Sequence, residues 1–286
     1  MRFAKGQGTG NDFVILPDPD GQLELSAGVV ARLCDRRFGL GGDGVLRVVR
    51  TAAAGADVPG SQPAEWFMDY RNADGSVAEM CGNGVRVFAR YLLDCGLAAG
   101  PDLAVATRAG LRLVREEADG QLTVDMGAAQ VTGAGRVQLG EHQLDGLAIS
   151  VGNPHLACVT DMPVWDIDLS APRLLAPDRP AGGVNVEIVR ITGEHEAEMR
   201  VHERGSGVTL SCGTGAVAAA VAAATRAGDW AAGRELTWAL RVPGGRLAVT
   251  PSATASRLTG PAEIVAHGEL AGGWLAGVAR EQAVIA

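Results

Sequence analysis

Apolar residues that alternate with polar ones predict strands over much of the first half of the chain. The opening 16 residues predict a strand, a glycine turn and a second strand. Further predicted strands lie near 45–49, 66–70, 103–107, 111–115 and 121–126. Helical spacing of apolar residues appears over 26–38 and again just after Cys81. This half is therefore predicted to combine a sheet with two helices.

The second half repeats this order of elements. Its predicted strands lie near 136–149, 156–160, 185–189, 197–202, 236–242, 246–250 and 262–266. An alanine-rich helix follows Cys212, as a helix follows Cys81 in the first half. Repetition of one pattern within a chain is typical of gene duplication. We therefore expect an N-terminal half over 1–118 and a C-terminal half over 119–267, with the tail at about 268–286 returning to the first half.

Two cysteines occupy matching places in the two halves, each at the start of a predicted helix. Cys81 is followed by Gly-Asn-Gly and Cys212 by Gly-Thr-Gly. A helix N-terminus carries unpaired N–H groups and a partial positive charge, which stabilise a thiolate and lower the thiol pKa. Two such thiols predict an acid and a base for opposite faces of one substrate. The other cysteines, which lack this context and are interpreted as small apolar core residues, are Cys34, Cys95 and Cys158.

Composition and charge narrow the class of protein. The chain has 286 residues, 47% of them hydrophobic, which suits two domains of ordinary size. Its net charge is −8 and no block of Lys or Arg stands out, so nucleic-acid binding is disfavoured. The longest apolar run, 216–224, is too short to span a bilayer, and the opening residues lack the apolar region of a signal peptide. We expect a cytoplasmic protein with no nucleic-acid or membrane partner.

Cysteine spacing and lysine content bear on cofactors. The five cysteines are widely spaced and include no C-x-x-C pair, so we expect neither a disulfide framework nor a metal site. Lys5 is the only lysine in the chain. A pyridoxal-phosphate enzyme needs a lysine for its Schiff base, and a residue this close to the N-terminus is a poor candidate. Amino-acid chemistry here is therefore expected to run without a cofactor.

The glycine-rich segment 39–44 matches G-x-G-x-x-G, but we do not interpret it as a dinucleotide site. That motif follows a strand and opens a helix. Here a predicted helix precedes the glycines and a predicted strand follows them. A tight loop from helix to strand explains the segment better.

Several polar residues near the cysteines have both an ordinary and a functional interpretation. Glu203 and Arg204 could form an exposed ion pair, or Arg204 could hold a carboxylate while Glu203 holds an ammonium or tunes a thiol. His155 could be a solvated turn residue or a modulator of thiol pKa. The asparagines that are weak signals individually, because Asn is frequent in turns, are Asn11, Asn72 and Asn185.

Taken together, these residues resemble the diaminopimelate epimerase family. The matching segments are Gly8–Phe13, Asn72–Ser76, Cys81–Arg86, Gly152–His155, Asn185–Val186, Glu203–Gly205 and Cys212–Gly215. They occur in family order over nearly the whole chain. The resemblance implies an α/β (α+β) fold of two pseudo-symmetric domains, each a strongly curved, mostly antiparallel sheet wrapped around a central helix. It also implies an active site in the interdomain cleft and a homodimer.

The resemblance further implies a role for each matching residue. Cys81 and Cys212 would be the two acid/base residues, and His155 and Glu203 would modulate their pKa values. The backbone amides that would hold the reacting α-carboxylate are those of Gly82, Asn83, Gly213 and Thr214. The remaining contacts to the small-molecule substrate would come from Asn11, Asn72, Asn153, Asn185, Glu203 and Arg204.

The implied reaction is cofactor-independent epimerisation of LL-2,6-diaminopimelate to the meso isomer, in lysine and peptidoglycan-precursor biosynthesis. One position departs from the family pattern, because many members carry Gln where this chain has Gly44 after Asp43. A water or a neighbouring side chain would replace that contact, or the site would be more open. Two alternatives stay open at this point: a proline or hydroxyproline racemase-type enzyme of the same fold, and a redox sensor that pairs Cys81 with Cys212.

Overall fold

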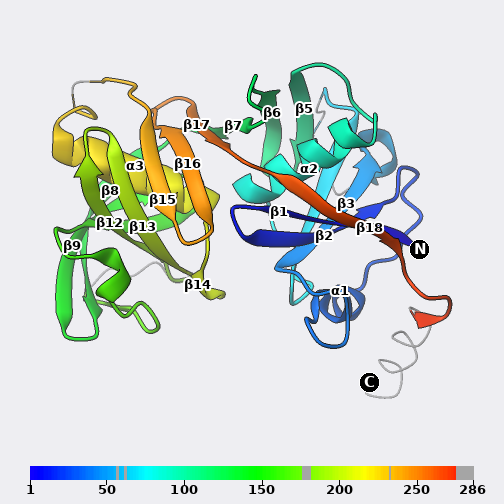
Figure 1. The fold of residues 1–286 in the computed structure, drawn as a ribbon, viewed down its shortest axis with the longest axis horizontal. Coiled ribbons are helices and arrows are strands. Elements are labelled where there is room, and N and C mark those ends of the chain that lie inside the picture. The colour runs from blue at the N-terminus through cyan, green and yellow to red at the C-terminus, as the bar shows by residue number, and fades with distance from the viewer. Residues whose placement is uncertain (56–57, 61–62, 176–181, 232, 275–286) are drawn as a thin grey trace. The chain divides into compact units, whose positions relative to one another are not determined.

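The chain folds into two compact units, shown as a ribbon in Figure 1. The computed structural model describes residues 1–55, 58–60, 63–175, 182–231 and 233–274. Unit 1 comprises Met1–Leu122 together with the chain from Pro261 onward, and unit 2 comprises Thr123–Gly260. The end of the predicted C-terminal tail, 275–286, lies outside the described residues.

Unit 1 is a single sheet with one helix on each face. Its strands are β1 (Arg2–Gly8), β2 (Asn11–Pro17), β3 (Gly44–Arg50), β4 (Trp66–Asn72), β5 (Asp102–Thr107), β6 (Gly110–Glu116) and β18 (Glu263–Glu269). Its helices are α1 (Ala27–Cys34), the short η1 (Thr51–Ala53) and α2 (Gly82–Asp94). The strands pair in the order β18-β1-β2-β3-β4-β5-β6. The β2–β3 and β4–β5 pairs are parallel and the others are antiparallel.

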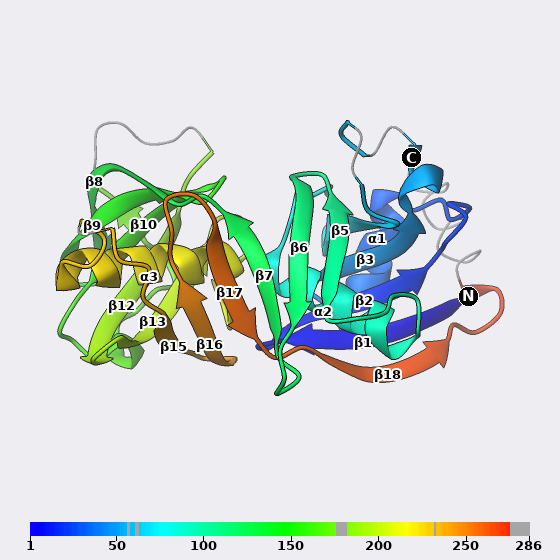
Figure 2. The same cartoon turned by 90° about the horizontal axis from the view of Figure 1, so that it is seen from above.

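Helix α2 is the central element of unit 1. It contacts every one of these strands, from β18 to β6. Neighbouring strands lie about 4.8 Å apart, so a flat sheet of this width would be roughly 29 Å across, far wider than a helix. The sheet therefore has to curve around α2, and Figure 2 shows the helix lying among these strands.

Helix α1 covers the opposite face of the unit 1 sheet. Val30 and Leu33 pack there against Val14 of β2. The helix ends at Cys34, four residues earlier than the predicted range 26–38. Asp35 causes this end, because it is extended and its carboxylate accepts the backbone N–H groups of the next turn.

Unit 2 contains the second sheet and the alanine-rich helix. Its strands are β7 (Leu122–Gly127), β8 (Gln130–Leu139), β9 (His142–Ser150), β10 (Pro154–Val159), β11 (Arg173–Leu174), β12 (Asn185–Gly193), β13 (Glu196–Glu203), β14 (Gly207–Thr209), β15 (Trp238–Val242), β16 (Gly245–Thr250) and β17 (Ser256–Gly260). Its helices are η3 (Val164–Asp166) and α3 (Gly213–Ala227). The main order is β8-β9-β10-β12-β13-β15-β16-β17-β7. The short β11 pairs with β8, and β14 pairs with β13.

The two sheets share one pairing pattern. Strands β1 to β6 alternate between antiparallel and parallel pairs, and the run β9-β10-β12-β13-β15-β16 alternates in the same way. Helix α2 precedes the fifth strand of its run, and α3 precedes the fifth strand of the other. The predicted α+β class, with a curved and mostly antiparallel sheet around a helix in each half, is confirmed.

Helix α3 is buried along almost its whole length. Residues 216–224 are no more than 1% exposed, and all of them are Ala or Val. Short side chains let strands approach the helix closely, and α3 contacts seven strands from β9 to β17. This packing explains an alanine-rich sequence that looks too weakly apolar to form a core.

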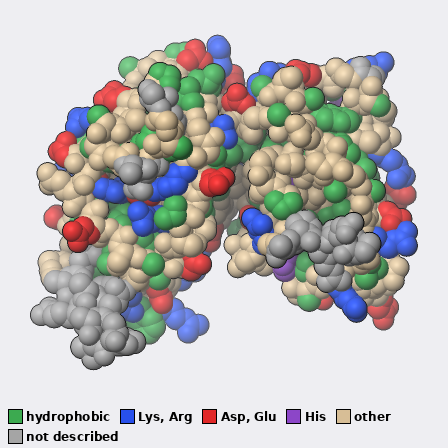
Figure 3. Space-filling view, turned by 180° about the vertical axis from the view of Figure 1, so that it is seen from behind, with side chains coloured by type: hydrophobic (Ala, Val, Ile, Leu, Met, Phe, Trp, Pro, Cys, Tyr) green, Lys and Arg blue, Asp and Glu red, His purple; other side chains and the backbone are tan. Residues whose placement is uncertain are grey.

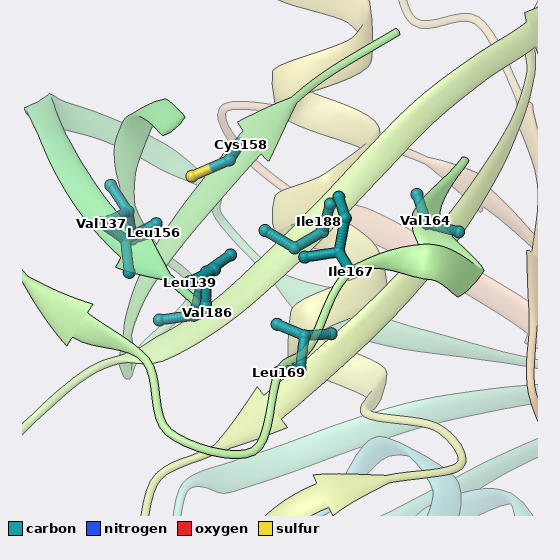
Figure 4. Packing of buried hydrophobic residues seen from close by; sticks show 9 residues of the cluster. All are labelled: Val137, Leu139, Leu156, Cys158, Val164, Ile167, Leu169, Val186 and Ile188. Atoms are coloured by element: carbon teal, nitrogen blue, oxygen red, sulfur yellow. The ribbon is translucent and has the colours of Figure 1, made fainter. Parts of the chain in front are cut away.

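A second apolar layer covers the outer face of the unit 2 sheet. Figure 4 shows its members, which come from β8, β10, β12 and the segment around η3. Cys158 is among them and is fully buried. Cys158, and likewise the buried Cys34, is therefore a small apolar core residue, as the sequence predicts. The same interpretation is wrong for Cys95, which is exposed.

The helices and the surface charge bear on whether the protein binds membranes or nucleic acids. None of the helices in the described ranges combines the length and the apolar character needed to cross a membrane. On the face shown in Figure 3, acidic and basic side chains are scattered among uncharged ones. The surface seen there is a mixed one, in keeping with a modest net charge of −8.

Candidate active site

Two cysteines begin the two central helices in the same conformation. Cys81 caps α2 with φ −137° and ψ 120°, and Cys212 caps α3 with φ −126° and ψ 121°. The Sγ of Cys81 accepts a hydrogen bond from Gly84 N, and that of Cys212 accepts one from Gly215 N, each 3.4 Å long. Cysteine thus takes the N-cap role that Ser or Asp usually fills. Each sulfur lies at the positive end of a helix.

Each of the two helices also begins with backbone N–H groups directly after its capping cysteine. The first two residues are Gly82 and Asn83 in α2, and Gly213 and Thr214 in α3. N–H groups in these positions have no partner within the helix. At each helix start, such N–H groups can bind a carboxylate.

Strand alternation gathers polar side chains beneath the first turn of α3. Side chains along a strand point alternately to its two faces. On β12, Val186 and Ile188 join the outer apolar layer, so Asn185 and Glu187 point toward α3. Strand β10 pairs in parallel with β12 and sets His155 opposite Asn185. Three polar groups therefore share the inner face of one sheet.

A chain of hydrogen bonds runs from Glu187 to the thiol of Cys212. Glu187 Oε1 lies 2.7 Å from His155 Nδ1, and His155 Nε2 lies 2.9 Å from Asn153 Oδ1. Asn153 Nδ2 donates to Thr214 Oγ1 at 3.2 Å, and this hydroxyl lies 3.5 Å from Cys212 Sγ. The side chains of His155 and Glu187 are 0% exposed, so water does not screen them.

Glu203 reaches the same sulfur from the end of β13. Its carboxyl group accepts a hydrogen bond from the hydroxyl of Thr209 and is hydrogen-bonded to the thiol of Cys212. Burial raises the pKa of Glu203, the two hydrogen bonds partly offset this, and the charge of Glu187 raises it further. The structure therefore places Glu203 against Cys212 and not in an exposed ion pair.

The lowered thiol pKa expected at both helix starts is wrong for Cys212. Burial raises the pKa of this thiol well above its ordinary value, and the charges of Glu203 and Glu187 raise it further. Hydrogen bonds from Thr214 and Gly215 act in the opposite direction and are outweighed. The expectation rests on the helix N-terminus alone, whereas desolvation and two carboxylates reverse its effect. Cys212 is a thiol at neutral pH.

Asn11 is the first neighbour of Cys81. Its Oδ1 lies 3.5 Å from Cys81 Sγ and 3.4 Å from Asn83 Nδ2. Its Nδ2 donates to Asp43 Oδ2 at 2.7 Å, so this carboxylate fixes which end of the amide faces the sulfur. Asp43 belongs to the glycine-rich loop, which joins α1 to β3 as the sequence predicts. That loop therefore serves the cysteine site.

A buried cation lies on the same helix as Cys81. Arg86 is 0% exposed and donates to Thr9 Oγ1 at 3.2 Å, Asn83 Oδ1 at 3.0 Å and Pro261 O at 3.4 Å. None of these acceptors is charged. Burial lowers the pKa of Arg86 to about 10, and the charge of Cys81 opposes this. The cysteine of unit 1 thus has a buried cation nearby, where its counterpart in unit 2 has two buried carboxylates.

Two further predicted residues lie apart from the sulfurs. Asn72, at the end of β4, donates from Nδ2 to Ser76 Oγ at 3.0 Å. The backbone N–H of Arg204 donates to Asn185 Oδ1 at 2.9 Å. Among the described residues, no side-chain hydrogen bond joins Asn72 or Arg204 to either cysteine.

Gly44 occupies a position with no room for a side chain. A Cβ there would lie 2.5 Å from Arg71 O and 2.7 Å from Tyr70 Cε2. The glutamine that many family members carry therefore does not fit this backbone. The backbone of Arg71 and the ring of Tyr70 occupy the space that a side chain at Gly44 would need.

Glu187 belongs to the Cys212 network but is not among the residues that the sequence predicts for the site. A usable signal is present, because Glu187 follows Asn185 by two residues on an otherwise apolar strand. Residues two apart on a strand share a face. An acidic residue is rarely placed on a strand that is buried on both faces. When it also shares a face with a candidate site residue, it becomes a candidate itself.

Comparison with known proteins assigns the chain to a family. The family model described as diaminopimelate epimerase matches residues 3–132 and 147–265. The chain belongs to the diaminopimelate epimerase family. A diaminopimelate epimerase of Thermobifida fusca (strain YX) is 57% identical over 274 residues, which cover 94% of this chain and 98% of the relative. One of Streptomyces coelicolor is 52% identical over 287 residues, covering 97% and 98%. The resemblance seen in the motifs is confirmed.

Solved structures share the fold at low identity. A hydroxyproline epimerase from Agrobacterium vitis aligns with a TM-score of 0.67 at 14% identity, covering 94% of this chain and 91% of that one. A phenazine biosynthesis protein of the PhzF family from Bacillus anthracis aligns with a TM-score of 0.65 at 15% identity, covering 95% and 99%. At such identities the likeness concerns the fold alone, so residue roles in this family member come from its own site.

Proposed function

We propose that the chain converts LL-2,6-diaminopimelate to the meso isomer without a cofactor, in lysine and peptidoglycan-precursor biosynthesis. The observation that carries this proposal is the pair of cysteines capping two helices in one conformation, in a chain of this family. Inversion of a carbon needs a base on one face and an acid on the other. A duplicated helix start supplies one thiol for each.

The reaction needs one thiolate and one thiol at the start, and we assign the thiolate to Cys81 and the thiol to Cys212. The Cys81 thiolate takes the α-proton, which breaks the C–H bond and leaves a carbanion beside the α-carboxylate. The Cys212 thiol then gives its proton to the opposite face and becomes the thiolate. No electron is transferred to or from the protein. The buried carboxylates beside Cys212 and the buried Arg86 beside Cys81 support this distribution of the proton.

The backbone amides at the two helix starts would stabilise the carbanion. Its negative charge spreads onto the α-carboxylate, which we place against the N–H groups of Gly82, Asn83, Gly213 and Thr214. Donors fixed before the reaction stabilise developing charge without reorganising. His155 and Glu203 would tune the thiol on their side of the substrate, since both belong to the network around Cys212.

The distal end of diaminopimelate accounts for the remaining polar residues. It carries a second ammonium and a second carboxylate with fixed handedness. We assign its recognition to Arg204, which can bind a carboxylate with two N–H groups, and to amide side chains. These amides are those of Asn11, Asn72, Asn153 and Asn185. A racemase-type activity on proline is not favoured, because curated relatives at 52–57% identity are named for diaminopimelate.

We also propose the setting in which the enzyme works. The two pseudo-equivalent halves would each supply one cysteine, and the chain would act as a homodimer in the cytoplasm. The five cysteines are free in the structure, which suits a reducing compartment. Light scattering coupled to gel filtration would give twice the chain mass for the homodimer, and a monomer mass would refute it.

Serine substitutions and deuterium labelling test the proposed reaction. Cys81→Ser and Cys212→Ser should each lower turnover of LL-diaminopimelate at least a thousandfold, because a hydroxyl is a far weaker acid and base here. Cys95→Ser, at an exposed cysteine, is the matched control and should keep wild-type turnover. Meso product formed in deuterated water should carry deuterium at the inverted carbon. Full activity in either active-site variant, or product without deuterium, would refute the two-thiol mechanism.

A further inference from the structure

Glu187 is a buried carboxylate close to Cys212 that the sequence does not predict as a site residue. Its side chain is 0% exposed, and its Oε1 is shared with His155 Nδ1 at 2.7 Å. Its Oε2 is also buried and has no hydrogen-bond partner among the described residues. A carboxylate in this state costs free energy to bury, and a neutral side chain of the same shape would cost less. Stability therefore gives no reason for an acid here.

The carboxylate faces the sulfur of Cys212 across a glycine. A Cβ added to Gly215 would lie 2.8 Å from Glu187 Oε1 and 3.3 Å from Cys212 Sγ. Because both atoms lie close to that one point, they are at most about 6 Å apart. Charges at this distance in a dry site interact strongly.

The groups around the Cys212 sulfur come from four elements. Glu187 approaches from β12, Glu203 from β13, and the chain from His155 comes from β10. The first turn of α3 itself adds the hydroxyl of Thr214 and the N–H of Gly215. Burial is the largest cause of the raised pKa of Cys212, the charge of Glu203 comes next, and the charge of Glu187 adds to both.

We propose that Glu187 is a positioning residue that keeps the proton on Cys212 between turnovers and holds His155 and Asn153 in line with it. The inference rests on the proposed function, in which Cys212 starts as the acid. After Cys212 gives its proton to the carbanion, the thiolate lies beside two carboxylates. That thiolate is a strong base, which suits removal of a proton in the reverse direction.

The substitution Glu187→Gln tests this role, because it keeps the shape and removes the charge. The measurement is the rate of alkylation by iodoacetamide from pH 6 to 10, read for each cysteine by peptide mass spectrometry. In Glu187→Gln the midpoint of Cys212 alkylation should fall by about one pH unit or more. The midpoint of Cys81, which lies in the other unit, should not move. An unchanged or higher Cys212 midpoint in the folded variant would overturn the proposal.

Two further measurements keep the test decisive. Glu198→Gln is the matched control, since Glu198 also lies on the unit 2 sheet but pairs with Arg241 and Trp165 on the outer side. It should leave the Cys212 midpoint where it is, and a similar shift in this control would overturn the inference. If Glu187→Gln does not fold, the wild type still tests the premise that Cys212 keeps its proton, because its Cys212 midpoint should lie above the ordinary thiol value of about 8.5. A midpoint below that value would refute the role of Glu187.

The alkylation profile is independent of the substrate. If Glu187→Gln shifts Cys212 but the wild type does not act on diaminopimelate, the proposed function fails and the role of Glu187 stands. If the wild type is active and the profile does not shift, the inference about Glu187 fails alone. In the active enzyme, Glu187→Gln should also move the pH dependence of kcat/KM for the meso substrate to lower pH.

Discussion

One pair of glycine substitutions compares the two helix starts directly. Gly84 and Gly215 are the third residues of α2 and α3, and each donates its N–H to the capping cysteine. Neither has a positive φ, so alanine is compatible with both backbones. A Cβ at Gly84 would make ordinary contacts of 3.4–3.5 Å, with Cys81 Cβ, Leu46 and Phe13. A Cβ at Gly215 would lie 2.8 Å from Glu187 Oε1, inside any normal contact distance.

The expected magnitudes follow from these contacts. Alanine in place of a compatible glycine stabilises a protein by about 0.4–1 kcal/mol, because it restricts the unfolded chain. Gly84→Ala should show this gain. Gly215→Ala has the same gain but also overpacks a buried site, which costs about 1–3 kcal/mol. The Glu187 side chain cannot move away freely, since His155 holds its Oε1. Gly215→Ala should therefore be less stable than Gly84→Ala by about 1–3 kcal/mol.

Equilibrium unfolding in urea, followed by far-ultraviolet circular dichroism, measures this difference. The wild type is the common reference for both variants, and equal slopes with urea show that the comparison is valid. Gly215→Ala with the same stability as Gly84→Ala would contradict the reasoning. It would mean that Glu187 moves at no cost and is not held between His155 and α3.

Two more predictions concern charge and cysteine reactivity. Burial alone would raise the pKa of Asp12, but Arg36 and Lys5 lower it to about 2. The ion pairs of Asp12 therefore stabilise the fold fully above pH 3.8, and this stabilisation is lost as the pH falls toward 2. Lys5→Met should lower the free energy of unfolding, measured in urea, by on the order of 1 kcal/mol at pH 6 and by much less at pH 2. Equal losses at the two pH values would contradict this role of Lys5. Burial raises the pKa of Cys34 to about 11 and that of Cys158 to about 12. At pH 8, iodoacetamide should therefore modify the exposed Cys95 and leave Cys34 and Cys158 intact in the folded protein. Modification of Cys158 as fast as Cys95 would show that the outer layer of unit 2 opens readily.

The sequence predicts the elements of the fold better than their pairing. Alternation and helical spacing are local, so most strands and both central helices are visible in the pattern. The strand β17, Ser256–Gly260, is missed because Leu258 is the only hydrophobic residue among its five. The pairing of β18 with β1 joins residues more than 250 positions apart, and no local pattern specifies such a partner. The end of α1 depends on one carboxylate, that of Asp35, which spacing alone does not reveal.

The candidate site is predictable where it depends on motif and unpredictable where it depends on burial. The cysteines at two helix starts follow from glycine spacing, and Asn153 and His155 follow from their shared turn. The raised pKa of Cys212 does not follow, because it requires knowing that Glu203 and Glu187 are buried beside the sulfur. Tyr70 filling the place next to Gly44 is likewise a contact across strands, which a single sequence does not show.

The duplicated site has one backbone and two opposite charge environments, and the proposed chemistry requires this difference. Two identical thiols would share their proton equally, and states with two protons or none would compete with the working state. A buried cation on one side and buried carboxylates on the other separate the two titrations and favour one thiolate with one thiol. Arg86 and Glu187 have uncharged or incomplete hydrogen-bond partners and cost stability where they lie. This loss of stability is understandable if each of the two residues sets the charge of one cysteine. Replacing either by a neutral residue would make the charge environments of the two cysteines more alike.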